Sequence, residues 1–149
     1  MAKTIPPQIK KEIVIEAPLD VVWRVLTQPD QMRQWFRAEA ELDLRSGGRG
    51  RLASYEIRVE AVDPLRRFAF RWVYPEGATP DARNSTLVEF TLSREAGGTR
   101  LRVVESGFDQ IDWSDAEKAR QVESHTQGWV ECLERIGRLG SRAGMRGQP

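Results

Sequence analysis

The hydrophobic pattern of the C-terminal region predicts one long amphipathic helix over residues 114–140. On a helical projection with about 100° per residue, three apolar side chains fall within roughly 40° of Trp129, namely Val122, Leu133 and Ile136. His125, the single histidine of the chain, falls on the same apolar face. At ~1.5 Å per residue the helix is about 40 Å long, which is enough to cross a small domain. A polar ring on the apolar face of so long a helix indicates a lid over a curved sheet, with space beneath it.

Upstream of this helix, period-two alternation predicts strands that are joined mainly by hairpins. Residues 38–45 alternate strictly between apolar and charged positions, and Gly97-Gly98 separates two further alternating stretches, as in a hairpin. The segments 50–54 and 55–62 are either two strands or one long bent strand. The expected order is a strand at 9–16, helices at 19–27 and 30–36, strands at 38–45, 50–54, 55–62, 67–74, 86–93 and 99–106, and the helix at 114–140.

This order predicts an α+β fold. About seven strands form one curved antiparallel sheet, which wraps around the long C-terminal helix, and two short helices follow the first strand. Pro18 fits the first turn of a helix, Pro29 ends that helix, and Ser114 with Glu117 forms a capping-box pattern at the start of the last helix. We expect one domain over 8–140, with disordered tails at 1–7 and 141–149.

Composition narrows the classes of partner. The 23 basic and 22 acidic residues give a net charge of +1, which argues against nucleic acid as the main partner. No run of about 18 apolar residues predicts a membrane span, and the N-terminus lacks the apolar core of a signal peptide. The single cysteine, Cys132, rules out an internal disulfide and fits a reducing compartment, so we expect a cytoplasmic protein.

Two titratable residues are candidates for chemistry. His125 faces the sheet either as a simple hydrogen-bonded interior group or as a group that titrates near neutral pH. Alternation through Leu101 and Val103 points Glu105 inward, unless the strand ends before it. An inward carboxylate needs a partner, which His125 or Lys118 could supply. Our hypothesis is that Glu105 and His125 share the polar end of a cavity and are the candidate catalytic residues.

A second group of candidates is aromatic. The strand at 67–74 places Phe68, Phe70, Trp72 and Tyr74 on one face, where they form either ordinary core or the wall of a ligand pocket. The residues predicted to bind ligand are Trp129, His125, Tyr55, Phe70, Trp72, Tyr74, Glu105 and Val122.

Most familiar reaction centres are excluded by count or spacing. Cys132 and His125 lie about 10.5 Å apart along a helix, too far for a thiol–imidazole dyad. One histidine and one cysteine cannot build the usual His/Cys zinc site within one chain, and no phosphate-binding, dinucleotide-binding or nucleophile-elbow motif occurs. We therefore expect no metal and no cofactor.

Four stretches of the chain together carry a resemblance to a known family. They are IEAPLDVVWRVLTQPDQMRQW from Ile15, RSGGRGRLASYEIRVEAVDPLRRFAFRW from Arg45, GGTRLRVVESGF from Gly97 and HTQGWVECLERIGRL from His125. In this order they resemble the START-like helix-grip superfamily (SRPBCC, or START/Bet v1-like). Within it, the chain is similar to the group named for the C-terminal domain of the activator of the Hsp90 ATPase (AHSA1). The resemblance runs from about Ile9 to Leu139.

The resemblance implies a tunnel or cavity between the sheet and the long helix, whose polar lining decides what is bound. Related proteins bind lipids or other apolar ligands, and some catalyse cyclisations. Family members often associate through a strand edge or the rim, so the resemblance leaves open whether this chain forms a homodimer. Eukaryotic Hsp90 activators carry a separate N-terminal domain, which we do not expect here because only about eight residues precede the first strand.

The leading expectation is a helix-grip protein that binds a small hydrophobic or amphipathic molecule without transforming it. The first alternative is a cyclase-like or hydrolase-like enzyme that uses Glu105 and His125 as an acid–base pair. The second is a chaperone co-factor or protein-interaction module, for which Phe108 and Trp113 are the expected exposed anchors and an Hsp90-type chaperone is a partner to consider.

Overall fold

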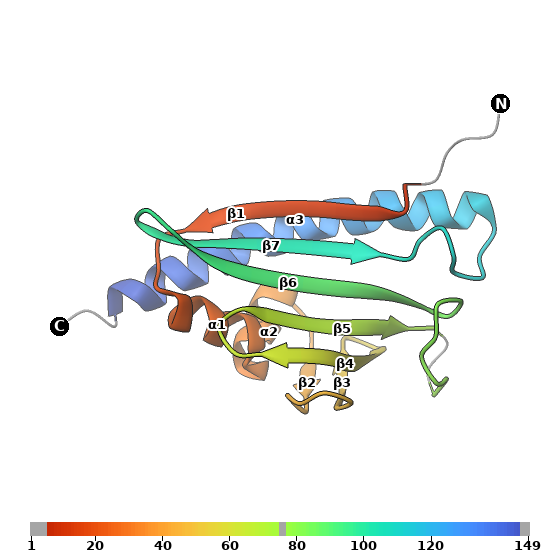
Figure 1. Ribbon diagram of the computed structural model, residues 1–149, viewed down its shortest axis with the longest axis horizontal. Coiled ribbons are helices and arrows are strands. Elements are labelled where there is room, and N and C mark those ends of the chain that lie inside the picture. Colours follow the sequence, from red (N-terminus) through yellow and green to blue (C-terminus); the bar gives the residue numbers. More distant parts are fainter. Residues whose placement is uncertain (1–5, 75–76, 147–149) are drawn as a thin grey trace.

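A single curved sheet and three helices make up the computed structural model, which describes residues 6–74 and 77–146 (Figure 1). In chain order the elements are β1 (Gln8–Ile15), α1 (Leu19–Thr27), α2 (Pro29–Phe36), β2 (Ala40–Leu42), β3 (Arg49–Leu52), β4 (Tyr55–Asp63), β5 (Arg67–Val73), β6 (Ser85–Glu95), β7 (Gly98–Ser106) and α3 (Asp115–Arg146).

The seven strands form one antiparallel sheet in the order β1-β7-β6-β5-β4-β3-β2. Consecutive strands are neighbours from β2 to β7, and only β1 pairs out of sequence, with β7. The long helix α3 lies along one face of the sheet, while α1 and α2 lie beside its C-terminal half (Figure 1). This is the helix-grip arrangement, and it confirms the predicted α+β fold.

The two short helices form where the prolines predict them. Pro18 has extended backbone and precedes α1, and Pro29 occupies the first turn of α2, where its missing N–H needs no partner. The apolar face of α1 is buried, and the indole nitrogen of Trp35 on α2 donates to the carbonyl of Val25 on α1 at 2.9 Å. This bond fixes the two helices against each other.

The long helix extends six residues beyond the predicted end at Gly140, so the expectation of a disordered tail from residue 141 is wrong for residues 141–146. The reason is tertiary packing of small residues. A Cβ atom at Gly140 would lie 2.9 Å from Ile15 Cγ2, and one at Gly144 would lie 3.2 Å from Ala17 Cβ. These glycines let the last turns of α3 pack closely against the link between β1 and α1. Residues 1–5 and 147–149 lie outside the described residues.

The second strand is shorter than predicted. Alternation indicated a strand over 38–45, but β2 covers only Ala40–Leu42. A tight turn replaces its second half, because Asp43 O accepts from Arg45 N at 2.9 Å and Arg45 O accepts from Gly48 N at 2.8 Å. The segment 50–63 forms two strands, separated by Ala53 with a positive φ of 56°.

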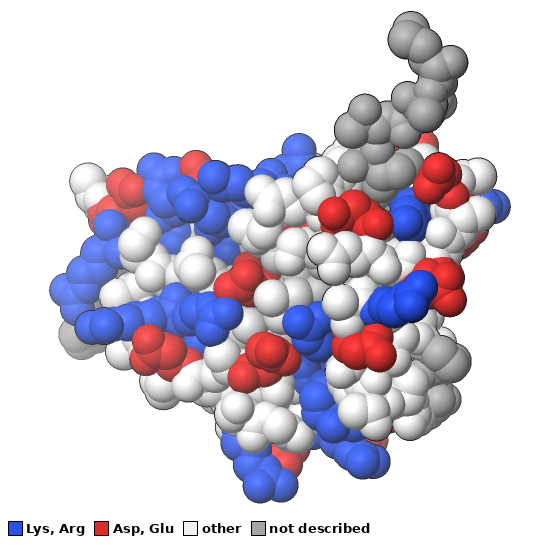
Figure 2. Space-filling model, turned by 45° about the vertical axis from the view of Figure 1, so that its right-hand side comes forward, with Lys and Arg blue, Asp and Glu red and all other residues white. Residues whose placement is uncertain are grey.

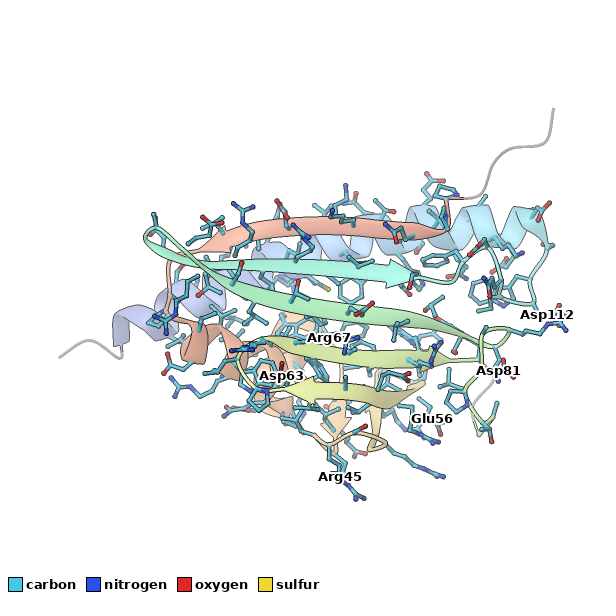
Figure 3. The ribbon with its side chains drawn as sticks, viewed as in Figure 1. Arg45, Glu56, Asp63, Arg67, Asp81 and Asp112 are labelled. Carbon is cyan, nitrogen blue, oxygen red and sulfur yellow. The ribbon has the colours of Figure 1, made fainter. Side chains whose placement is uncertain are left out.

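The two faces of the sheet differ in chemistry. The inner face carries Phe68, Phe70 and Phe90, all fully buried against α3 and α2. The outer face carries ion pairs, such as Arg67 Nη2 with Glu89 Oε2 at 2.6 Å and Arg100 Nη1 with Glu12 Oε1 at 2.7 Å. Arg67 is labelled on this face in Figure 3, and Figure 2 shows basic and acidic side chains interspersed over the face in view. Mixed charge of this kind solvates the open face of the sheet.

No helix within the described ranges has both the length and the apolar character needed to cross a bilayer.

Candidate functional site

A buried carboxylate lies at the centre of the candidate site. Alternation along β7 turns Leu101, Val103 and Glu105 toward α3, and Glu105 is fully buried. Its Oε2 accepts a hydrogen bond from Thr86 Oγ1 at 2.6 Å, and its Oε1 accepts from Trp129 Nε1 at 2.8 Å. These donors come from β6 and α3, so the carboxylate links the sheet to the long helix.

His125 completes the group of side chains around this carboxylate. Its Nδ1 lies 2.8 Å from Glu105 Oε1, and its ring lies between those of Trp72 and Phe108, with centroids 5.6 Å away in each case. Within the described chain Nε2 has no hydrogen-bond partner, and it is not among the buried unpaired atoms. We call Thr86, Glu105, His125 and Trp129 the Glu105 cluster.

The Glu105 cluster can orient an imidazole. A carboxylate bound to one ring nitrogen fixes the plane of the ring and sets which nitrogen carries the proton. The other nitrogen is then available to a molecule beside it. This chemistry is suited to hydrogen bonding with a ligand and to proton transfer.

A small pocket lies beside His125, between the middle of α3, the end of α2 and Trp72 on β5. Its volume is about 180 Å³, and its lining residues are Phe36, Trp72, Ser124, His125, Gly128, Trp129 and Cys132. The hollow implied by the resemblance is this small because fully buried rings such as Phe70 and Phe90 fill the space behind Trp72 and Trp129. We call it the His125 pocket.

The wall formed by Trp72 contains an unpaired donor. Its indole is 7% exposed, and its Nε1 is buried with no hydrogen-bond partner among the described residues. The rings of Phe36, Tyr55 and His125 surround it at centroid distances of 5.6, 5.9 and 5.6 Å. Buried donors are nearly always paired in native proteins, so an unpaired one beside a pocket requires an explanation.

Tyr74 lies near the Glu105 cluster, and the charge of Glu105 influences the pKa of its phenol. Burial raises the pKa of the Tyr74 phenol above its ordinary value, and the charge of Glu105 and the neighbouring Tyr55 raise it further. The ring contacts Tyr55 at 5.8 Å and Trp113 at 5.1 Å between centroids. Tyr74 therefore stays neutral and belongs to an aromatic ridge that leads away from the pocket.

The structure distributes the predicted ligand-binding residues over different environments. Trp72, His125 and Trp129 line the pocket, and Glu105 lies behind them. Phe70 is fully buried core, Tyr55 is 46% exposed, and Tyr74 and Val122 are partly buried outside the pocket lining. The remaining lining residues were not predicted: Phe36, Ser124, Gly128 and Cys132. The spacing of 125, 128, 129 and 132 along one helical face would have identified Gly128 and Cys132.

One sequence-based expectation is wrong, and one of the two alternative partners of Glu105 does not contact it. Phe108 is fully buried against His125 because the chain turns inward after β7, so Phe108 is no exposed anchor. Trp113 is only partly exposed and packs on Tyr74. Lys118 does not reach Glu105, since its Nζ donates to the carbonyl of Asp109 at 3.0 Å near the start of α3.

Larger hollows occur elsewhere on the surface. One of about 670 Å³ lies between the β6–β7 turn and the start of α1, and one of about 600 Å³ is lined by Tyr74, Trp113 and the loop before β6. Asp81 and Asp112, which line the second hollow, lie at the same end of the molecule in Figure 3. Both have as much polar as apolar lining, whereas the smaller His125 pocket is mainly apolar and contacts the buried cluster. We therefore consider the His125 pocket the better candidate site.

No group of three or more His, Cys, Asp or Glu residues within the described ranges comes together in a way that could hold a metal ion.

Solved structures with the same architecture include MLL2253 from Mesorhizobium loti, which is 24% identical with a TM-score of 0.75, over 91% of this chain and 97% of that one. CalU16 from Micromonospora echinospora is 28% identical with a TM-score of 0.69, over 97% and 85% of the two chains. DynU16, from the dynemicin biosynthetic locus, is 26% identical with a TM-score of 0.69, over 89% of this chain and 46% of that one. No curated protein matches the sequence.

The family comparison covers most of the chain. Residues 16–140 match the family described as Activator of Hsp90 ATPase homolog 1-like protein. This range extends from the end of β1 to the last turns of α3 and includes the Glu105 cluster and the His125 pocket. The chain therefore belongs to the Activator of Hsp90 ATPase homolog 1-like family, within the START-like helix-grip superfamily.

Proposed function

We propose that this protein binds a small apolar or amphipathic molecule in the His125 pocket. The observation that carries the proposal is a mainly apolar pocket lined by His125, whose Nε2 has no hydrogen-bond partner among the described residues. Ligand sites typically combine apolar walls with a few convergent polar groups. Trp72, which also lines the pocket, has a buried N–H without a partner in the part of the chain that the structure describes.

The volume of the pocket limits the size of the ligand. Its volume of about 180 Å³ lies below the ~300–1,000 Å³ of sites for drug-sized molecules. An apolar cavity of about 150 Å³ accommodates benzene. A single ring, or the ring-bearing end of a longer molecule, therefore suits this pocket better than a lipid tail.

A thermal-shift screen of small metabolites tests the proposal. Since a ligand stabilises by RT ln(1 + [L]/Kd), a ring-bearing ligand at 100 times its Kd should stabilise the protein by about 2.7 kcal/mol. Gly128→Leu should abolish the shift, because a Cβ at Gly128 meets nothing within 4 Å and a leucine would extend into the pocket. Glu123→Leu, an exposed position on the same helix, is the matched control and should keep the shift. The proposal fails if no class of molecule shifts the melting temperature, or if the shift survives in Gly128→Leu.

A second candidate function is acid–base catalysis on the bound molecule. The hydrogen bond between Glu105 and His125 supports it, since a carboxylate-bound imidazole is a common general base. Ligands found in the screen should then be converted slowly by the wild-type protein, as followed by NMR. His125→Ala should lose this turnover while it keeps the native circular dichroism spectrum. Equal conversion by both proteins would contradict catalysis by His125.

A role as an interaction module has weaker support. Of the two expected anchors, Phe108 is fully buried and Trp113 packs on Tyr74. Contact with an Hsp90-type chaperone would have to use other surface residues.

A further inference from the structure

We infer that the His125 pocket selects ligands that donate a hydrogen bond, in particular a hydroxyl group carried on one aromatic ring. This selectivity rests on the proposed binding function and adds to it the chemical class of the ligand.

The direction of the hydrogen bonds at Glu105 determines what His125 can offer. The indole of Trp129 can only donate, and it donates to Oε1; the hydroxyl of Thr86 donates to Oε2. An ionised carboxylate accepts only, so the 2.8 Å contact between Oε1 and His125 Nδ1 requires the proton to lie on Nδ1. Imidazole is a stronger base than a carboxylate, which places the shared proton on the ring.

The other ring nitrogen, Nε2, is then an acceptor and not a donor. In a neutral imidazole with its proton on Nδ1, Nε2 carries a lone pair and acts as an acceptor. His125 lines the pocket, and no described residue bonds Nε2. The pocket therefore presents an acceptor, which a ligand O–H or N–H group satisfies and a carbonyl or ether oxygen does not.

The indole of Trp72 favours a hydroxyl among the donors. The rings of Trp72 and His125 lie 5.6 Å apart, and the buried Nε1–H of Trp72 has no acceptor among the described residues, so a ligand atom that reaches both rings would gain from accepting as well as donating. A hydroxyl is the smallest group that both donates and accepts.

The aromatic walls of the pocket and the charge of Glu105 determine what the rest of the ligand can be. The rings of Phe36, Trp72 and Trp129 form apolar walls against which an aromatic ring packs well. The buried negative charge of Glu105 lies directly behind His125 and disfavours an anionic group such as a carboxylate. The class that meets these conditions is a phenol or a similar hydroxyl-bearing single ring.

The proton position on His125 can be measured directly. The chain has a single histidine, so its ¹⁵N resonances are unambiguous. At a pH where the ring is neutral, we expect the chemical shifts of the tautomer protonated on Nδ1. A ring protonated on Nε2 would overturn the inference, whatever the protein binds.

Ligand selectivity is tested with phenol, anisole, toluene and benzoate, by ligand-observed NMR titration at the same pH. Phenol should bind about fivefold or more tightly than anisole and toluene, as expected for one added hydrogen bond, and benzoate should bind most weakly. His125→Leu should reduce the ratio of phenol to toluene affinity to about one. Glu123→Gln, at an exposed position on the same helix outside the pocket lining, is the control and should leave that ratio unchanged.

The outcomes separate the inference from the proposed function. Equal affinity for phenol and anisole, or tighter binding of anisole or benzoate, overturns the selectivity and leaves ligand binding intact. A phenol preference that persists in His125→Leu overturns the role of His125. Binding of none of the four probes overturns the inference, while the wider metabolite screen still decides the proposed function.

Discussion

The indole nitrogen of Trp129 lies 2.8 Å from Oε1 of Glu105, so a buried hydrogen bond joins the middle of α3 to the end of β7. The same carboxylate accepts from Thr86 and contacts His125. One acidic side chain thus satisfies three polar groups that the fold buries or half-buries together. The following predictions depend on this arrangement and on the packing around it.

Replacing Glu105 should reveal how much stability the cluster provides. Glu105→Leu leaves the donors of Thr86, Trp129 and His125 without an acceptor, whereas Glu105→Gln keeps an oxygen at nearly the same place. Because an unsatisfied buried donor costs about 1–3 kcal/mol, the leucine variant should be about 2–4 kcal/mol less stable than the glutamine variant. Urea unfolding measures the difference. The exposed Glu123→Gln is the control, and equal stability of the two Glu105 variants would show that the cluster contributes nothing.

Two glycines of α3 should respond differently to alanine. Nothing lies within 4 Å of a Cβ at Gly128, while a Cβ at Gly140 would lie 2.9 Å from Ile15 Cγ2. Gly128→Ala should therefore gain about 0.8–1 kcal/mol from helix propensity alone. Gly140→Ala should gain less or lose stability, since buried Ile15 has to shift. The free energies of urea unfolding test the pair, and equal gains at both positions would argue against the close packing of α3 on β1.

Tyr74 should make the protein less stable at high pH. Burial, with the charge of Glu105 and with Tyr55, raises the pKa of the folded phenol above the ordinary 10.0. Above pH 10 the unfolded chain then loses the phenolic proton while the folded chain keeps it, so stability falls as the pH rises from the unfolded to the folded pKa. The slope should reach up to about 1.4 kcal/mol per pH unit. Tyr74→Phe should reduce this slope in urea unfolding between pH 9 and 11. An unchanged slope would show that Tyr74 is not responsible.

Cys132 should react slowly with thiol reagents. Burial is the main cause that raises its pKa from 9.0 to about 11; the charge of Arg135 opposes the shift, and that of Glu131 adds to it. At pH 8 the thiolate fraction is therefore about 100-fold smaller in the folded protein than in the unfolded one, and burial slows access further. Iodoacetamide labelling with and without urea measures the ratio, and since the chain has one cysteine the signal belongs to Cys132. Similar rates in both conditions would contradict its burial. A pocket ligand should slow the labelling of the folded protein further.

Much of the site could be predicted because its parts follow local periodicity. Alternation along residues 101–105 correctly turned Glu105 inward, and helical spacing correctly placed His125 beside Trp129. Thr86 and Phe36 were not predicted as members of the site, because each reaches it from an element distant in the sequence. The sequence left His125 and Lys118 open as partners of Glu105, and only the structure selects His125, because spacing along a helix does not give the distance to the facing strand.

By itself, the pattern of apolar and polar residues determined the order of elements, the antiparallel sheet and the apolar face of α3, because periods of two and 3.6 directly reflect strand and helix geometry. Tertiary packing decided the rest. It extended α3 to Arg146 by seating Gly140 and Gly144 against the end of β1. It also packed aromatic rings such as Phe70 and Phe90 behind the His125 pocket, whose volume is about 180 Å³. Both outcomes depend on how side chains from distant segments share volume, which a one-dimensional pattern does not contain.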